Sequence, residues 1–492
     1  MFLERGRQRQ TLLTHLFAGI VFVCLVEIPC AAAADPAAML QGVQIRPSLS
    51  LEIIASDNVR RTATHHRSDV VVAPQAGLFV TGETRRLKLF ASANLHYDEF
   101  LEDSTLNRLT GNLLGHGTLT IVPDFFVVDA SAQISDEFLR VADQSPTGLP
   151  NGNPQTRVLN TQLSPSLTTD FLGEADATLR ASVAEVQFSN LQGAAPSASL
   201  SNSTIYQGSG LLTNGARSRM MEWRLSGDYT FEPRADGQDF SSADGLFGLT
   251  FRVTPKIHVV GRVGYEMISD PAIPDIRDAI WSGGFSYNLG SSSVVTAERR
   301  HSFGRDSWYG NMNLAVSSLI SVTGGYEERF ENEQRRLSRF LTDIFNQGGT
   351  PPPQPSPVSL GENLVNQAFF VKDARLGASY KTEHSGFDLS ATLSQREFTG
   401  LATRDETASI IARYTETLPA NLLFDLTGSY YATLESQTGV AKTHAYTASG
   451  GFTYRLYEDV GARLTYVWTQ TETNGVEPIS EDLVTASVSK TF

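Results

Sequence analysis

The chain has 492 residues, of which 39 are basic and 53 acidic, so its formal net charge at pH 7 is −14. This acidic balance excludes a globally basic nucleic-acid-binding protein, because affinity for phosphate requires a cationic surface. Hydrophobic residues make up 41% of the chain, which is too many for an intrinsically disordered protein. No stretch reaches the ~18–20 consecutive apolar residues of a membrane-spanning helix, and this excludes a polytopic helical membrane protein.

The N-terminal segment 1–34 has the three parts of a secretory signal peptide. Three arginines are followed by an apolar core at 16–26 and by an alanine-rich region that ends at Ala34. We expect cleavage after Ala34. Both cysteines of the sequence, Cys24 and Cys30, lie in the removed segment. The mature chain is therefore expected to lack disulfides, thiolate metal sites and cysteine nucleophiles.

The mature sequence repeats an alternation of apolar and polar or small side chains with a period of two. In 443–456, for example, Tyr446 and Phe452 fall on one face, whereas Thr447 and Thr453 fall on the other. Such a pattern predicts a β-strand with one apolar face. The alternating segments run for about ten to fifteen residues, longer than the ~5–6 of soluble strands and enough for the ~9–11 of a tilted membrane-crossing strand.

The connections between these segments alternate between short turns and long polar loops, as in outer-membrane barrels. Counting hairpins predicts 18–22 strands, with 22 as the best count, and 202–212 is included because an even number of strands requires it. We therefore predict that 35–492 form a single all-β domain, a transmembrane antiparallel up-and-down β-barrel of outer-membrane type. Both termini would then lie on the short-turn side, which we take as the periplasm. The expected long loops are 57–67, 98–108, 136–156, 189–201, 232–242, 268–278, 331–366, 433–442 and 471–479.

Two other architectures are compatible with many strands. Tandem β-sandwiches would need two apolar inner faces and shorter strands. A TonB-dependent transporter also has 22 strands but needs an N-terminal plug domain, and the first predicted strand begins near Gln41. With ~20 strands the lumen is too wide for side chains to fill, so the apolar face is expected to contact lipid. Aromatic residues near strand ends, such as Tyr97, Tyr265 and Trp308, fit the girdles of such a barrel.

The polar face of the predicted strands is rich in charge. These residues would line the lumen, where they would order water, set ion selectivity or contact a sugar polymer. Alternatively, they form cross-strand pairs that only stabilise the wall. The predicted lumen-lining residues are Arg46, Glu52, Arg86, Lys88, Arg180, Glu222, Arg224, Asp228, Arg252, Arg262, Glu266, Arg375, Arg413, Arg455 and Arg463.

The long loop 331–366 differs from the others. Its first part, 331–347, has the apolar stripe of an amphipathic helix, made by Leu337, Phe340, Leu341, Ile344 and Phe345. The proline-rich segment 348–357 then forms an extended spacer. Such a helix would either fold inward as a constriction or gate, or cover the barrel rim, and we favour the rim.

No pattern of catalytic residues is present, so we predict that the protein is not an enzyme and has no cofactor. The mature histidines are scattered and no local spacing assembles a catalytic dyad. His65 and His66 are adjacent, but a third metal ligand is not evident. The sequence contains no H-E-x-x-H, no nucleophile elbow and no phosphate-binding glycine loop.

The C-terminus carries a more specific signal. Val484, Ala486, Val488 and the terminal Phe492 share one face of the last predicted strand. This pattern resembles the signature that the outer-membrane assembly machinery recognises. Lys490 departs from it, because the usual residue at that position is apolar or aromatic.

Several short motifs together resemble the outer-membrane proteins associated with the PEP-CTERM/exosortase system, which are related to β-barrel porins. The resemblance covers nearly the whole mature chain, through loose strand patterns. It implies location in the outer membrane and a link to exopolysaccharide, but no reaction. The motifs are Pro47–Leu51, Ser56–Val59, Val72–Pro74, Gly77–Val80, Thr84–Leu89, Phe125–Gln133, Thr254–Pro255, Val263–Glu266, Glu298–His301, Ser307–Tyr309 and Thr323–Glu327.

The expected function is therefore a porin-like or export channel, with exopolysaccharide as a candidate solute and periplasmic export proteins as candidate partners. Outer-membrane lipid and the assembly machinery are the other expected partners. The alternative is a structural or surface-binding barrel in which the loops matter and the lumen does not. An open lumen and ion conductance would distinguish the channel from this alternative.

Overall fold

The structure is a computed structural model that describes residues 42–139, 148–153, 155–171, 173–190, 201–214, 220–233, 239–271, 273–290, 292–346, 368–398, 403–436 and 442–492. The predicted signal peptide 1–34 and the proline-rich spacer 348–357 lie outside the described residues. For residues 340–346 the backbone alone is described.

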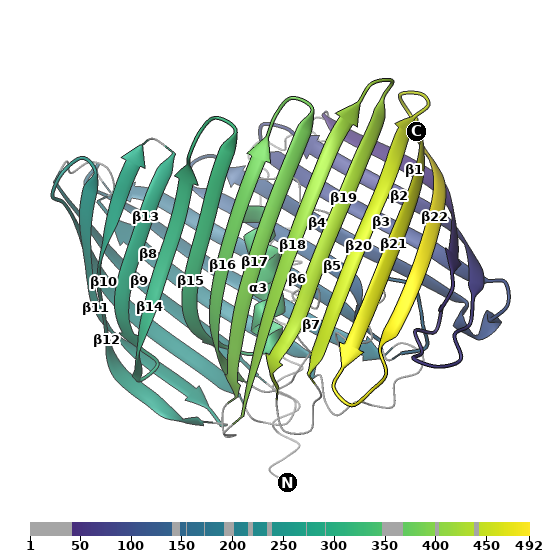
Figure 1. Cartoon of the computed structure of the whole chain (residues 1–492). Helices are drawn as coiled ribbons and strands as arrows, with labels where there is room; N and C mark the ends of the chain where they lie inside the picture. Colours follow the sequence, from purple (N-terminus) through teal and green to yellow (C-terminus); the bar gives the residue numbers. More distant parts are fainter. Residues whose placement is uncertain are drawn as a thin grey trace, which may run out of the picture.

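The described strands form one antiparallel sheet of 22 strands that closes on itself (Figure 1). Closure comes from β22, which pairs with β21 on one side and with β1 on the other. The prediction of a 22-stranded antiparallel barrel is confirmed, and 202–212 corresponds to β8. A single closed sheet also excludes tandem β-sandwiches. The strands are β1 (Val43–Ser56), β2 (Asp69–Glu83), β3 (Leu87–Phe100), β4 (Arg108–Val122), β5 (Phe126–Phe138), β6 (Gln155–Phe171), β7 (Ala175–Asn190), β8 (Ser203–Thr213), β9 (Met221–Glu232), β10 (Phe240–Arg252), β11 (Ile257–Asp270), β12 (Ile273–Gly290), β13 (Ser293–Ser302), β14 (Arg305–Ala315), β15 (Ile320–Glu331), β16 (Phe369–Lys381), β17 (Ser385–Phe398), β18 (Arg404–Leu418), β19 (Leu422–Glu435), β20 (Thr443–Arg455), β21 (Val460–Thr473) and β22 (Ile479–Thr491).

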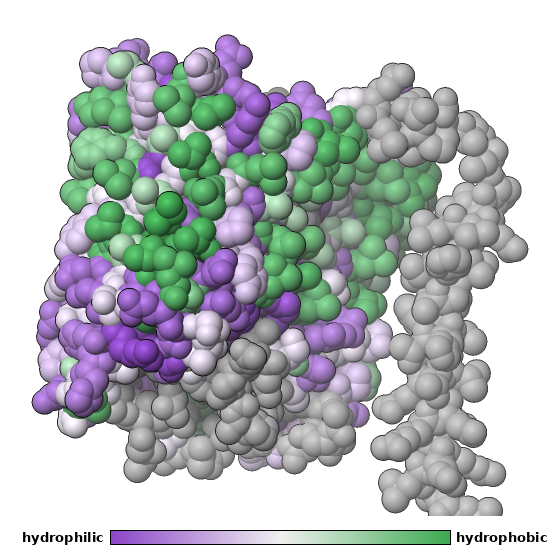
Figure 2. Space-filling view, turned by 90° about the vertical axis from the view of Figure 1, so that its right-hand side faces the viewer, coloured by the Kyte–Doolittle hydropathy of each residue, from purple (hydrophilic) through white to green (hydrophobic). Residues whose placement is uncertain are grey.

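The outer face of the wall is apolar. On β1 the exposed residues Leu49, Leu51 and Ile53 alternate with polar residues, and Leu51 pairs with the exposed Val488 of β22. Because paired residues share a face, this outward set continues around the barrel. Figure 2 shows the resulting belt of hydrophobic residues, with hydrophilic residues gathered below it. Only an apolar solvent such as lipid accommodates this much exposed apolar surface.

The two ends of the barrel differ in their connections. One end, here called the short-turn end, carries tight turns such as 84–86 and 419–421, and the chain ends there at Phe492 (Figure 1, top). The opposite end, here called the long-loop end, carries 57–68, 139–154 and the connection between β15 and β16.

One expected long loop is absent from the described residues. The segment 268–278 belongs mostly to β11 and β12, which are separated only by residues 271 and 272. The prediction of a loop there is wrong, because its apolar residues continue the strands and pack inward. Ile268, Ile273 and Ile276 join Phe240 and Phe330 in a buried cluster.

The buried apolar residues lie at the long-loop end rather than in a continuous core. One cluster joins the strand ends to the loops and includes Ile54, Phe100, Leu106, Leu149 and Leu483. Two helices are described, the short 3-10 helix η1 (Ser104–Leu106) and the α-helix α3 (Glu333–Asn346). None of the described helices is long and apolar enough to cross a membrane.

Candidate functional site: a helix held inside the barrel

The inner face of the wall carries the residues that alternate with the outward apolar set. Glu52 of β1, for example, lies between the exposed Leu51 and Ile53 and accepts a hydrogen bond of 2.6 Å from Nε2 of Gln75 on β2. Strand register then places every predicted lumen-lining residue except Arg86 on this inner face. Arg86 lies in the turn between β2 and β3.

Many of the predicted lumen-lining residues make ion pairs, either within their own strand or with a strand one or two places away. Arg463 lies 3.2 Å from Asp425, and Arg180 lies 3.5 Å from Asp129. The other pairs within 4 Å are Arg252 with Glu222, Arg262 with Glu298, Arg375 with Asp373, and Lys88 with Glu83. Among the described residues, Arg224, Asp228, Arg413 and Arg455 make no ion pair, and they leave charge directed into the lumen.

Exposure of the inner face changes from one end of the barrel to the other. Inward side chains near the short-turn end are mostly exposed or half-buried, whereas inward side chains near the long-loop end are mostly buried. The same change occurs on strands spaced around the whole barrel. The exposed and buried members are Arg46 and Ser56 on β1, Arg224 and Glu232 on β9, and Asp388 and Arg396 on β17. The lumen is therefore open toward the short turns and filled toward the long loops.

Helix α3 accounts for part of this filling. It follows β15 in the chain but contacts β5, β6 and β7, which lie across the barrel from β15. Asn160 of β6, fully buried, donates a hydrogen bond of 2.7 Å to the carbonyl oxygen of Leu337. The Leu337 side chain packs on Val158 and Val186 of the same wall. Figure 1 shows α3 between the strands of the front wall and those of the back wall.

The helix thus lies inside the barrel, and our preference for a helix over the rim is wrong. Its apolar stripe correctly indicates that one side is buried, but periodicity does not say which surface buries it. The described part of α3 also carries many charged side chains. Over a lipid-facing rim these side chains would find fewer ion-pair and hydrogen-bond partners than they find inside a polar lumen.

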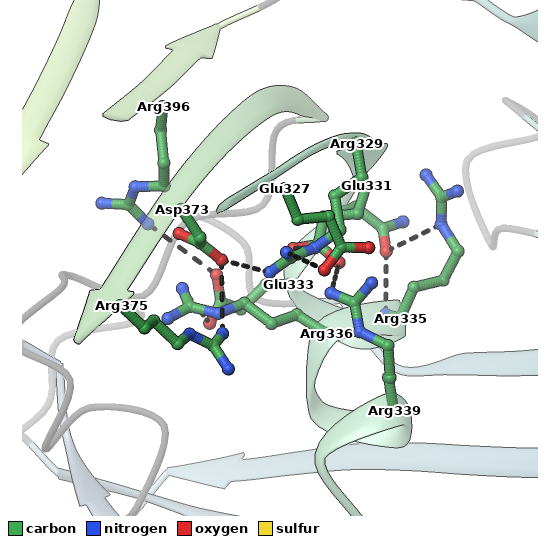
Figure 3. Close-up of polar contacts among 11 residues, drawn as sticks. Glu327, Arg329, Glu331, Glu333, Arg335, Arg336, Arg339, Asp373, Arg375 and Arg396 are labelled. Atoms are coloured by element: carbon green, nitrogen blue, oxygen red, sulfur yellow. Dashed lines mark hydrogen bonds and ion pairs between the residues drawn. The ribbon is translucent and has the colours of Figure 1, made fainter. Parts of the chain in front are cut away.

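Arg329, at the end of β15, is the centre of the charged network that anchors the start of α3 (Figure 3). Its guanidinium contacts three carboxylates, with nitrogen–oxygen distances of 3.0 Å to Glu331, 3.2 Å to Glu327 and 2.5 Å to Asp373 on β16. Glu331 also binds Arg339 of the helix. Because the Arg329 side chain is only 10% exposed, loss of one member would leave buried charge unpaired.

Two further contacts attach the helix to other parts of the wall. Glu333 in the first turn lies 3.9 Å from Arg396 of β17, which also binds Asp405 of β18 at 3.0 Å. On the opposite side, Asn332 donates hydrogen bonds of 2.9 and 3.0 Å to Glu232 of β9. The start of α3 is therefore held by polar contacts to β6, β9, β15 and β17.

This network is not among the predicted lumen-lining residues. Arg329, Asp373, Arg396 and Asp405 continue the inward alternation of their strands, so strand parity alone could have included them in the lumen-lining set. Their pairing with a helix that crosses the lumen has no signature in the sequence. The dense run of charged residues in 331–339 could have indicated that the helix enters the lumen. A helix that covers the rim needs fewer charged residues.

The described residues contain no group of three or more histidine, cysteine, aspartate and glutamate side chains that could hold a metal ion. His301 lies 2.8 Å from Asp306 and 3.1 Å from Asp278, near strand ends on β12–β14. The predicted C-terminal signature lies on β22, where Val484, Val488 and Phe492 are exposed.

The barrel resembles known structures, although no family model matches the sequence and no curated protein matches it significantly. The siderophore receptor PirA from Acinetobacter baumannii superimposes with a TM-score of 0.51 at 8% identity, covering 91% of this chain and 80% of that one. The apoprotein form of the FrpB iron transporter from Neisseria meningitidis (F5-1 variant) gives a TM-score of 0.50 at 10% identity, covering 92% and 82%. At such identities the similarity shows a shared fold, the closed 22-stranded barrel of outer-membrane receptors.

Proposed function

We propose that this protein is a gated outer-membrane conduit whose long-loop end is closed by α3. The observation that carries the proposal is the burial of the inner face at that end, together with its exposure at the short-turn end. With the short turns in the periplasm, the resting barrel is a vestibule that opens to the periplasm and is shut toward the outside.

The contacts of α3 suit a gate better than a permanent wall. Among its described side chains, Leu337 supplies the apolar contact to the wall. The other attachments are hydrogen bonds, ion pairs and the cation–π contact of Arg335 with Phe240. When α3 leaves, lumen water reaches the charged groups on both the helix and the wall, so none of them stays both buried and unpaired. The apolar area that is exposed at the same time is small, and its exposure costs little. The strands that surround the helix are continuous and need not move for it to leave.

We also propose a polar polymer, such as exopolysaccharide, as the solute. The vestibule carries charges of both signs on its inner face, including Arg224, Asp228 and Arg413, and this mixture favours neither cations nor anions strongly. The sequence resemblance to the PEP-CTERM-associated outer-membrane proteins supports the same solute class. Partner proteins would deliver the polymer from the periplasm, and the proposal assigns no enzymatic reaction to the chain.

A reversible tether tests the gate. The double variant Val158→Cys/Leu337→Cys places two thiols where the side chains now touch, in a predicted mature chain without other cysteines. Combined with Arg329→Gln, which weakens the anchor, the reduced protein is expected to conduct ions in planar bilayers. Oxidation should abolish that conductance, and reduction should restore it.

Two controls make the result specific. Each single cysteine variant should conduct equally with and without reductant. Arg404→Gln, which removes an exposed ion pair with Glu435 at the same end of the barrel, should leave the low conductance of the native protein unchanged. If the reduced tether variant conducts no more than the oxidised one, the helix is a permanent filling and the structural or surface-binding barrel is the better interpretation.

A further inference from the structure

A polar pocket of about 310 Å³ lies at the long-loop end. Three connections form it: the loop between β1 and β2, the loop between β3 and β4, and the loop between β5 and β6. Its volume falls in the range of small-ligand sites. None of the described residues that line it is aromatic. The lining residues are Arg60, Thr105, Leu106, Arg108, Pro150, Asn151, Gly152 and Asn153.

Arg60 has one end of its guanidinium fixed and the other directed at the pocket. Nε lies 2.5 Å from Asp103, and Nη2 donates a hydrogen bond of 2.7 Å to Thr105. Nη1 lies beside Gly152, 3.5 Å from the position that a β-carbon there would occupy. It makes no hydrogen bond to the described residues. The hydrogen bond from Arg60 holds the pKa of Asp103 well below its usual range, so this anchor stays charged at neutral pH.

Arg108, the first residue of β4, supplies a second guanidinium. Nη2 donates a hydrogen bond to Gln155, whereas Nε is buried and has no hydrogen-bond partner among the described residues. A buried donor without a partner costs free energy, but this nitrogen is not accessible to a ligand. Two guanidinium groups therefore line one pocket, and the donor without a partner that lies beside its lining is Nη1 of Arg60.

The pocket is held by rigid structure. Leu106 in its lining belongs to the buried apolar cluster with Leu149, Phe100 and Ile54. Gly152 adopts φ of +84°, a conformation that residues with a β-carbon rarely adopt, and Asn153 donates its backbone N–H to the Asn151 side chain at 3.0 Å. The site is thus organised before a ligand arrives, which lowers the entropic cost of binding.

We propose that this pocket binds a small hydroxyl-rich oxyanion, namely a sugar that carries a carboxylate or a phosphate. Guanidinium forks match the two oxygens of such groups, and the asparagine and threonine side chains suit sugar hydroxyls. Among the described lining residues, Arg60 and Arg108 are charged and none is acidic, so the lining favours an anion. Binding at this site is measured without reference to conductance, so this proposal and the proposed gate can fail separately.

Calorimetric titration of the purified full-length barrel in detergent tests the proposal, with glucuronate, glucose 1-phosphate, inorganic phosphate and glucose as separate probes. At least one of the two sugar oxyanions should bind at least about tenfold more tightly than glucose, since a charge-assisted hydrogen bond has that effect. Tighter binding of glucuronate or of glucose 1-phosphate identifies the source of the oxyanion. Equal binding of glucose, or no binding of any sugar probe, would overturn the proposal. So would inorganic phosphate binding as tightly as the better sugar.

Variants then assign the binding to this pocket. Arg60→Lys keeps the charge beside Asp103 but removes the fork, and Arg108→Gln removes the second guanidinium. Each should weaken binding about tenfold or more, and Asn153→Ala should weaken it without altering any ion pair. Arg67→Gln is the matched control: Arg67 also contacts Asp103, at 3.2 Å, but does not line the pocket. An equal loss of affinity in Arg67→Gln would show that binding depends only on the overall positive charge, and it would refute the assignment of binding to this pocket. The circular dichroism spectrum of each variant should match that of the native protein, which shows that the barrel is still folded.

Discussion

At the scale of single residues, alternation along the strands carries most of the information. Because side chains point to opposite faces at successive positions, Arg252, Arg262 and Arg463 could be placed opposite the apolar residues from the sequence alone. Arg86 could not, since alternation stops where a strand turns, and the boundary between Glu83 and Leu87 has no sharp signal. The partner of each charge also depends on strand register, which a single strand does not encode.

Arg396 shows how much one buried charge contributes. Its side chain is 2% exposed and lies 3.0 Å from Asp405, with the rings of Phe369 and Phe398 within 5.6 Å of the guanidinium carbon. Arg396→Gln should lower the free energy of unfolding by about 3–5 kcal/mol, because it leaves buried carboxylates without their cation. Urea titration of the barrel in lipid vesicles measures this loss.

The comparison for Arg396→Gln is Arg404→Gln, which removes the same charge from an exposed pair nearby. Its unfolding midpoint should match that of the native protein. A small effect of Arg396→Gln, equal to that of Arg404→Gln, would mean that water reaches the interior at this end and that the buried network is weaker than its geometry indicates.

At the scale of elements, strands and helix differ in what their patterns reveal. In a barrel, a strand with one apolar face can only turn that face outward to lipid. β8 could therefore be predicted even though its alternation is weak, because the barrel needs an even number of strands. The stripe of α3 defines a buried side, but β6, the rim and a partner protein would each satisfy it. Likewise, the polar residues in 268–278 suggested a loop, whereas Ile268 and Ile276 are held in strands by contacts with Phe240 and Phe330, residues distant in the chain.

The docking of α3 through Leu337 can be tested at this scale. Leu337→Ala removes most of a side chain that is 2% exposed, and such truncations cost about 2–5 kcal/mol. Hydrogen exchange of peptides from 333–346 should therefore accelerate, while exchange in β6 and β17 stays slow. Leu389→Ala, on the outer face of β17, should change none of these rates. Unchanged exchange in 333–346 would show that the ion pairs alone hold the helix.

At the scale of the whole molecule, the two faces of the wall contact different solvents: the apolar outer face contacts lipid and the polar inner face contacts water. Adjacent residues of β1 make a direct test, because Leu51 faces outward and Ser50 faces inward, where it donates a hydrogen bond to Gln75. In a barrel embedded in lipid, Leu51→Arg should lower the free energy of unfolding by about 2–4 kcal/mol if it lies near the bilayer midplane. Ser50→Arg, in contact with lumen water, should cost much less. Equal costs in vesicles would show that this wall does not face lipid.

Alternation of side chains and the spacing of turns were enough to predict an antiparallel barrel of 22 strands, since both are local properties of the chain. The state of its lumen was not predictable from such patterns. Closure of the long-loop end depends on Asn160, Glu232, Arg329 and Arg396, which come from four distant strands and meet only around α3 once the wall has closed. The pocket at the long-loop end likewise needs Arg60, Arg108 and Gly152, which come from three separate parts of the chain. Local sequence specifies which face of each strand meets lipid, whereas contacts between distant segments exist only after register and curvature bring the strands into one barrel.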